Sequence, residues 1–383
     1  MKVALVYDRV NKFGGAERVI ASLHKIFPEA PLYTLVYDKE SSGWSKGITV
    51  IPTFLNRFPL LRKRHEWLAP IAPLAFETLD LSAFDVVVSV TSSDAKAIIT
   101  SPKQLHICYC LTPTRYFWSG EGEYLKDLKM KFLPGFIYRY LQSVDVFTST
   151  RPDKYIAISR EVQNRIERFY SRDSSIVYPA IDDKFYLTHT SSKRRREYYL
   201  LVSRLVPYKK TELAILAFNK LKKKLIVVGE GSELSNLQKM AENNISFVGR
   251  VSDERLIDYY HSAKAVIFPQ NEDFGLVPLE TQASGTPVIA FGKGGALETI
   301  VPNVTGLFFP KQTASSLVLA VKRFETMSFS PDACIKNAKN FSEQKFISEM
   351  SHTVNVLWKK HLLSFRSSFP TPAYIAMRSI AGR

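Results

Sequence analysis

Two glutamates in the C-terminal half, Glu272 and Glu280, have the residue type and spacing most suggestive of chemistry. The segment between them follows an apolar run and leads into the pattern of a short helix, and we expect Pro278 at the first helical position. The free amides of residues 274–277 would point out of the N-terminus of that helix, where Gly275 lets the backbone approach a bound group. The segment therefore predicts an anion site. We expect the two carboxylates to accept hydrogen bonds from sugar and ribose hydroxyls beside the anion.

Basic and glycine-rich loops follow two other apolar runs. Arg204 and Lys209 come after the run at residues 198–203, and Gly14 and Gly15 come shortly after the first run of the chain. Each feature alone has an ordinary explanation: a solvated loop for the cations, a tight turn for the glycines, helix-dipole partners for the glutamates. Their occurrence together, each after a predicted strand, favours a common ligand site.

The elements that must position these loops alternate between strand and helix patterns, which predicts parallel sheets covered by helices. Strands are expected in a first series near residues 2–8, 31–37, 84–90, 105–110 and 153–159, and in a second near 198–203, 224–229, 245–249, 264–269 and 286–291. Helices are expected at 15–27 and 160–170. In such sheets ligands bind beyond the carboxyl ends of the strands, where the three loops lie.

A polar, charged segment at residues 191–197 separates the two series and is typical of a domain linker, with a nuclear localisation signal as the rival interpretation. The 383 residues exceed what a single core usually serves. We therefore expect an N-terminal domain at 1–190, a C-terminal domain at 198–345, and a helix with a basic tail at 346–383 that returns to the N-terminal domain.

Composition narrows the class of protein. An apolar share of 45% and a charged share of 23% are typical of soluble globular chains, and no stretch of roughly 18 apolar residues occurs. The first residues lack the cleavage site of a secretory signal. Cys108 and Cys110 alternate within one apolar run, a spacing that suits neither a disulfide nor a zinc clip, so we expect a reducing cytoplasm.

A net charge of +16 indicates a polyanionic partner. No zinc finger or ribonucleoprotein signature is present, and at 54–67, 125–142 and 362–383 basic residues stand beside aromatic and aliphatic ones. This pattern favours an anionic membrane surface over nucleic acid. Solvated helices with an ordinary core face remain the alternative for these segments.

The motifs, in this order, resemble the family 4 glycosyltransferases over roughly residues 1–360. The resemblance is carried by Gly14-Gly15-Ala16-Glu17-Arg18, by Arg204 and Lys209, by Val227-Val228-Gly229-Glu230-Gly231, by Phe247-Val248-Gly249-Arg250, by Glu272 and Glu280 with Phe274-Gly275 and Pro278-Leu279 between them, and by Gly294-Gly295-Ala296-Leu297-Glu298-Thr299. It implies an α/β fold of the GT-B type, with two Rossmann-like, doubly wound parallel-sheet domains facing a cleft. It also implies that the donor lies in that cleft and that a sugar is transferred with retention.

The same resemblance assigns site residues. Catalytic roles fall to Glu272, Arg204 and Lys209, with Glu272 facing the sugar hydroxyls. Donor-binding roles fall to Gly14, Gly15, Arg204, Lys209, Gly249, Arg250, Phe274, Gly275, Leu276, Val277 and Glu280. Among these, Glu280 would face the ribose, residues 249–250 the base and residues 274–277 the phosphates. Because the two cations and the amides can neutralise a departing nucleoside diphosphate, we expect no cofactor and no metal.

Residues 106–118 resemble bacterial mannosyltransferases of lipopolysaccharide O-antigen and surface polysaccharide synthesis, which generally use GDP-mannose. The chain departs from their pattern at Leu111, which stands where the family has a histidine. Leucine makes no hydrogen bond, so the departure leaves the sugar and the strength of the activity open. We expect Arg115 to be an acceptor-side cation and His106 to pack or bond locally.

The predicted function is therefore hexosyl transfer, most simply of mannose from GDP-mannose, to a lipid-linked or polysaccharide acceptor at the cytoplasmic face of the membrane. The expected partners are the donor, that acceptor and an anionic membrane surface, without nucleic acid. Two alternatives stay open: a nucleotide-sugar epimerase of the same architecture, and a non-catalytic nucleotide-sugar-binding partner of a transferase.

Overall fold

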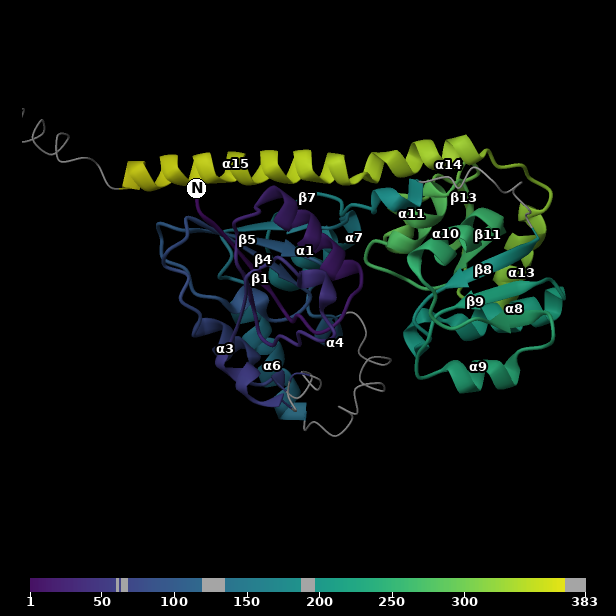
Figure 1. Cartoon of the computed structure of the whole chain (residues 1–383), viewed down its shortest axis with the longest axis horizontal. Helices are drawn as coiled ribbons and strands as arrows, with labels where there is room; N and C mark the ends of the chain where they lie inside the picture. Colours follow the sequence, from purple (N-terminus) through teal and green to yellow (C-terminus); the bar gives the residue numbers. More distant parts are fainter. Residues whose placement is uncertain (60–61, 63–67, 119–134, 187–196, 369–383) are drawn as a thin grey trace, which may run out of the picture.

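The computed structural model describes residues 1–59, 62, 68–118, 135–186 and 197–368. Within them the chain forms two doubly wound sheets in which every strand pairing is parallel, and this confirms the predicted α/β class (Figure 1). The predicted linker lies outside the described residues except for residue 197, as does the basic tail beyond residue 368.

The first sheet has seven strands in the order β3-β2-β1-β4-β5-β6-β7. They are β1 (Val3–Tyr7), β2 (Leu32–Thr34), β3 (Val50–Pro52), β4 (Val86–Thr91), β5 (Leu105–Cys110), β6 (Lys154–Ala157) and β7 (Ser174–Ile176). The helical elements are α1 (Gly15–Ile26), η1 (Gly43–Ser45), η2 (Phe54–Arg57), α3 (Ala72–Glu77), η4 (Ala95–Ala97), α4 (Arg115–Trp118), α6 (Gly135–Thr148) and α7 (Arg160–Tyr170). Strands β3 and β7 were not predicted, because each has three residues and neither is fully buried.

The second sheet has six strands in the order β10-β9-β8-β11-β12-β13. They are β8 (Tyr198–Val202), β9 (Leu225–Val228), β10 (Ile245–Phe247), β11 (Ala263–Phe268), β12 (Val288–Phe291) and β13 (Gly306–Phe309). The helical elements are η6 (Asp183–Tyr186), η7 (Pro207–Lys209), α8 (Thr211–Leu221), α9 (Leu234–Met240), α10 (Asp253–Ser262), α11 (Leu276–Ala283), α12 (Ala296–Thr299), α13 (Ala314–Phe324), α14 (Pro331–Ala338) and η8 (Lys339–Phe341). Strand β13 was not predicted; it begins at Gly306, where an added Cβ would lie 2.1 Å from the carbonyl oxygen of Val288.

The chain crosses between the two sheets twice on one side. After β7 it enters the second domain, and α15 (Glu343–Ser368) then runs back along the first domain (Figure 1). The ring of Phe346 lies edge-on to Tyr109 at 6.1 Å, and the Ser22 hydroxyl donates to Glu343 at 2.9 Å. Both domains therefore share a continuous apolar core near the crossings.

The strand order reverses at β1 and β4 in the first sheet and at β8 and β11 in the second. Loops that leave neighbouring strands in opposite directions open a crevice at such points, and this is where parallel sheets bind ligands. The Gly14-Gly15 loop follows β1, the Arg204 to Lys209 loop follows β8, and the Glu272 to Val277 loop follows β11. All three predicted loops therefore lie at switch points. Among the described helices, none is both long and apolar enough to cross a membrane.

Candidate active site

The loop between β11 and α11 is the centre of the site. Gly275 caps the helix with φ of 96°, a left-handed conformation that favours glycine, and α11 begins at Leu276. Pro278 is thus the third helical residue, and its predicted first position was wrong. The proline is tolerated there because no amide in the first turn has an intrahelical acceptor. The remaining amides of this turn start a helix whose positive dipole end faces the loop.

A glycine pair explains how this loop is held. The Gly295 amide donates to the carbonyl oxygen of Glu272 at 2.9 Å. A Cβ on Gly295 would lie 2.2 Å from the Phe274 Cα, and one on Gly294 would lie 2.4 Å from the Glu272 carbonyl oxygen. The Gly294-Gly295 motif therefore lets α12 approach the backbone of the loop that carries Glu272.

One of the two predicted cations pairs with the predicted carboxylate. The Lys209 ammonium pairs with Glu272, and both side chains are largely buried. The Tyr208 ring is surrounded by three cations, with Lys209 at 5.1 Å, Arg115 at 5.8 Å and Arg204 at 5.9 Å from its centroid. The pKa of Lys209 is lowered, first by burial and then by the charges of Arg204 and Arg115. The charge of Asp273 acts in the opposite direction and raises this pKa. Positive charge is concentrated here beyond what the carboxylates balance.

The loops after β9 and β10 adjoin the Arg204 loop. A Cβ on Gly229, whose φ is 135°, would lie 1.8 Å from the Ser203 carbonyl oxygen, so only glycine fits. The Gly229 amide donates to the Gly249 carbonyl oxygen at 2.8 Å, and the Arg250 amide reaches Glu230 at 3.4 Å. Gly249 and Arg250 thus lie at the same edge of the sheet as Arg204.

The N-terminal glycine loop lies against the loop between β11 and α11, the anion loop. Gly14 caps α1, and a Cβ on Gly15 would lie 3.0 Å from Cδ1 of Leu276. The structure therefore brings residues from the two domains into direct proximity.

Glu280 lies two residues further into α11 than predicted. It is the fifth residue of the helix, is buried, accepts from the Tyr260 hydroxyl at 3.0 Å and pairs with Arg18. Burial lowers the pKa of Arg18, but Glu280 and Asp253 outweigh it, so the pKa of Arg18 lies above its usual value. Arg18 belongs to the first glycine motif, yet the sequence did not identify it as a site residue. That Glu280 meets a ribose stays a prediction.

Asp273 is a second residue of the site that the sequence did not identify. Its carboxylate pairs with Arg115 and, at 2.5 Å, with Arg165, and both arginines belong to the N-terminal domain. A single aspartate beside Glu272 gave no signal of its own, because the partners are more than 100 residues away in sequence.

Two other residues from the sequence analysis lie at β5. His106 is buried, its Nε2 lies 2.8 Å from the Ser89 hydroxyl, and burial lowers its pKa to about 3, so the predicted local bonding is confirmed. Leu111 is half-buried against the core just beyond the end of β5, and its amide donates to the Thr91 carbonyl oxygen at 2.8 Å. Its side chain brings no hydrogen-bonding group to the cleft.

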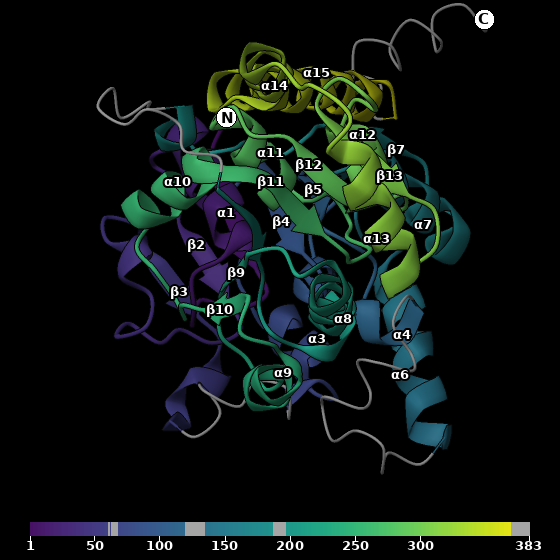
Figure 2. The same ribbon diagram turned by 90° about the vertical axis from the view of Figure 1, so that its right-hand side faces the viewer.

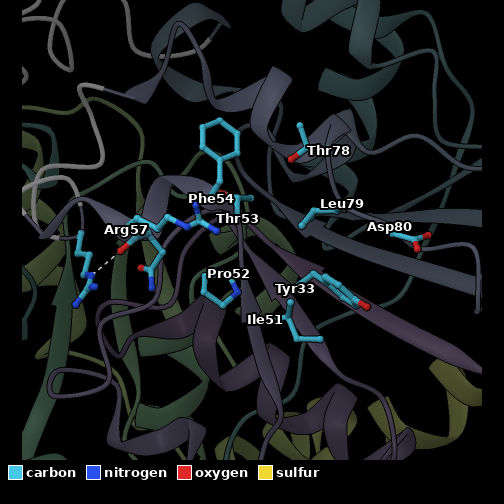
Figure 3. A pocket seen from close by; sticks show the side chains of 11 residues that line it. Tyr33, Ile51, Pro52, Thr53, Phe54, Arg57, Thr78, Leu79 and Asp80 are labelled. Atoms are coloured by element: carbon cyan, nitrogen blue, oxygen red, sulfur yellow. Dashed lines mark hydrogen bonds between the residues drawn. The ribbon is translucent and has the colours of Figure 1, made fainter.

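A separate hollow of about 670 Å³ lies at the β2–β3 edge of the first sheet. Figure 3 shows Phe54 and Arg57 on one side of it and Thr78, Leu79 and Asp80 on the other. It contains none of the predicted site residues. Within the described part of the chain, no group of three or more His, Cys, Asp or Glu residues is arranged to hold a metal. That the reaction needs no metal stays a prediction.

Comparison with known proteins agrees with the fold. The family described as Glycosyl transferases group 1 matches residues 185–341. A GDP-mannose-dependent alpha-(1-6)-phosphatidylinositol monomannoside mannosyltransferase of Mycobacterium tuberculosis is 28% identical over 43% of this chain and 50% of that protein. An uncharacterized glycosyltransferase of Methanocaldococcus jannaschii is 30% identical over 41% of this chain and 43% of that protein. The chain spans about half the length of these curated relatives.

Solved structures extend the likeness to nearly the whole chain. The Anabaena protein HepE in complex with UDP superposes with a TM-score of 0.69 and 18% identity over 93% of this chain and 100% of that chain. Sucrose-phosphate synthase from Thermosynechococcus elongatus superposes with a TM-score of 0.73 and 18% identity, over 94% and 100%. At this identity the likeness shows the fold. Residues 185–341 thus match the Glycosyl transferases group 1 family, and the chain as a whole has the GT-B fold.

Proposed function

We propose that this protein is a retaining glycosyltransferase that moves a hexose from a nucleotide sugar, with mannose from GDP-mannose as the first candidate, to a lipid-linked or polysaccharide acceptor. The observation that carries the proposal is the convergence of Arg204, Lys209, Glu272 and the first turn of α11 at one switch point of the second sheet.

The chemistry follows from the charges. When the glycosidic bond to the donor breaks, negative charge develops on the departing nucleoside diphosphate. Arg204 and Lys209 would bring two positive charges to one side of this group, and the α11 amides would donate hydrogen bonds to it. Arg204 and Lys209 are already placed around Tyr208, so little reorganisation of these cations is needed as the charge appears.

In this structure the Lys209 ammonium is paired with the Glu272 carboxylate. A bound diphosphate would compete for that ammonium and release the Glu272 carboxylate to accept hydrogen bonds from sugar hydroxyls. An anion beside Lys209 would also oppose the lowering of its pKa by burial and by the two arginines. The same site would thus couple phosphate binding to sugar recognition.

The names of matched proteins indicate candidates for the base and the sugar of the donor. One matched relative is described as GDP-mannose-dependent, whereas the HepE structures hold UDP or UDP-glucose. The loops at Gly229 and Gly249 are the part of this chain where a base would stack or hydrogen-bond. We take GDP-mannose as the first donor to test, with UDP-glucose as its direct competitor.

The membrane part of the proposal rests on exposed apolar side chains. Phe54, Leu74, Phe136, Tyr140 and Phe147 are each between 49% and 73% exposed. Figures 1 and 2 place α3 and α6, which carry four of them, at the end of the first domain opposite α15. Exposed aromatic residues on a chain of net charge +16 suit an anionic lipid surface at the cytoplasmic face. Parts of the predicted segments 54–67 and 125–142 lie outside the described residues.

The experiment that tests the function combines a donor panel with a membrane lipid extract. The protein is incubated with GDP-mannose, UDP-glucose or UDP-galactose, and released nucleoside diphosphate and glycosylated lipid are both measured. Release of nucleoside diphosphate together with labelled lipid supports the proposal. Donor epimerised without release would indicate an epimerase, and calorimetric binding without turnover would indicate a non-catalytic partner, to which Leu111 lends weight.

A further inference from the structure

Asp273 is held from both sides by the opposite domain. One carboxylate oxygen pairs with Arg115 of α4, and the other pairs with Arg165 of α7 at 2.5 Å. Its carbonyl oxygen accepts from the Ser159 hydroxyl at 2.5 Å. Three residues of the first domain therefore bind one residue of the loop that carries Glu272.

A second set of contacts attaches α7 to the second domain. The carboxylate of Glu298, at the end of the Gly294 motif, accepts from the amides of Arg160 at 2.8 Å and Glu161 at 3.2 Å. A carboxylate at this position satisfies free amides of the α7 N-terminus and interacts favourably with its dipole. The start of α7 is thus bound both to the loop after β11 and to α12.

An aromatic cluster lies under these polar contacts. Tyr178 stacks on Phe274 at 5.7 Å and meets Phe341 at 5.3 Å, while Phe274 and Phe341 are 5.7 Å apart. Phe274 follows Asp273 directly, so the anion loop is anchored at the point where the chain crosses between domains. The loop is therefore attached to the first domain as well as to its own sheet.

The ion pairs of Asp273 are explained better by a need for fixed geometry than by a gain in stability. Burial raises the pKa of Asp273, and the charges of Arg115 and Arg165 outweigh it and lower that pKa. Buried ion pairs are often no more stabilising than apolar residues of similar volume, but separating one leaves a buried charge without its partner, which is strongly unfavourable. The arrangement thus favours one relative position of the two domains.

We propose that Asp273 is a positioning residue that fixes the anion loop to the first domain through Arg115 and Arg165. It thereby fixes the position of the donor relative to the acceptor. Arg115 also lies 3.9 Å from Glu272, so the same contact places an N-terminal cation beside the predicted sugar-facing carboxylate. In this role Asp273 acts through Arg115 and Arg165 and not on the reacting atoms. The kinetic part of this inference rests on the proposed glycosyl transfer, and the part on domain position does not.

The test uses Asp273→Asn in the full chain, with Glu161→Gln as the control. Glu161 pairs with Arg165 at 2.8 Å within α7, so its variant removes a carboxylate from the same arginine without touching the domain contact. For Asp273→Asn we expect kcat to fall on the order of tenfold to a hundredfold, because small misplacements of reacting groups carry such costs. The Kd for GDP, whose predicted contacts lie mostly in the second domain, should change by less than about threefold. The control should match wild type.

Domain position is measured independently of activity. Cysteines introduced at Ser143 of α6 and Gln238 of α9 carry spin labels; the native Cys108, Cys110 and Cys334 are buried and should stay unlabelled. The distance distribution of the ligand-free protein should broaden in Asp273→Asn and stay as in wild type in Glu161→Gln. Arg165→Gln provides the same two readouts if the aspartate variant does not fold.

The outcomes separate the two proposals. A wild-type distance distribution in Asp273→Asn and Arg165→Gln would overturn the positioning role, whatever the enzyme does. An equal loss of GDP affinity and kcat in Asp273→Asn would also overturn it, since that indicates a direct binding group. If wild type neither binds nor turns over nucleotide sugars, the proposed function fails, and the distance distributions still decide this inference.

Discussion

Replacing Lys209 by glutamine should abolish most turnover while leaving the fold nearly intact. Glutamine keeps much of the length of the side chain but loses the charge that we assign to the departing diphosphate. Removing one preorganised donor from a site of developing negative charge costs about 2.7–4 kcal/mol, which is about 100- to 1000-fold in kcat. We expect a loss in this range.

The effect on stability should be much smaller, and the structure gives the reason. Lys209 pairs with Glu272, but burial and the positive charges of Arg204 and Arg115 act against its protonated form. Arg115 remains 3.9 Å from Glu272 after the substitution, so the carboxylate keeps a cation. Because Arg115 still compensates Glu272, the free energy of unfolding should change by less than about 1 kcal/mol, instead of the roughly 3–5 kcal/mol expected when a buried charge loses its only partner.

The assay is nucleoside diphosphate release from the donor that wild type uses, with urea unfolding measured in parallel. Lys223→Gln is the matched control, because Lys223 pairs with Glu325 at 2.8 Å in the same domain away from the cleft. The reasoning is refuted if Lys209→Gln keeps turnover within about threefold of wild type, or if the control loses as much. A Lys209→Gln protein that unfolds several kcal/mol more easily would instead assign the lysine to stability.

Three further predictions follow from particular contacts. Gly295→Ala should cost about 1–3 kcal/mol in urea unfolding because its Cβ would overlap the Phe274 backbone, whereas Gly43→Ala, with open space around it, should be nearly neutral. Burial keeps folded His106 neutral with a pKa of about 3 while the unfolded side chain titrates near 6.5, so its stability contribution is complete above pH 6.5 and is lost as pH falls toward 3. His106→Asn should therefore flatten the pH dependence of unfolding by up to about 1.4 kcal/mol per pH unit, and an unchanged slope would contradict the burial argument. Phe136→Glu should weaken sedimentation with anionic vesicles, added salt should release wild type, and equal binding to neutral and acidic vesicles would remove the membrane proposal.

The main strands were predictable because they are apolar runs bounded by polar loops. β4 and β5 are buried along their whole length, and such strands leave a continuous signal in the sequence. β7 reads Ser-Ser-Ile and is only partly buried, so its pairing with β6 depends on tertiary contacts that no local pattern reports. The same limit applies to the start of α11, which was expected two residues too late because Pro278 is tolerated throughout the first turn.

The candidate site was predictable only to the extent that its residues lie in short motifs. Glu272 and Lys209 were identified from their loops, and the structure pairs them. Arg165 stands in the middle of an amphipathic helix, where an arginine is ordinarily a solvated residue. Its partner Asp273 is 108 positions away, and only the packing of the two domains brings them together. Contacts of this kind are invisible to spacing arguments.

The return of α15 to the first domain constrains how the protein can fold during synthesis. This helix has 26 residues, about 39 Å in length, and its Phe346, Met350 and Val354 are buried in the core shared with α1 and β5. A ribosome delivers these residues only after the whole second domain has been translated. Until then, the apolar surface of the first domain that α15 covers stays exposed in the nascent chain, and we expect chaperones to bind it. A fragment ending near residue 190 should accumulate as aggregates, whereas adding residues 343–368 as a separate peptide should restore some of it to solution.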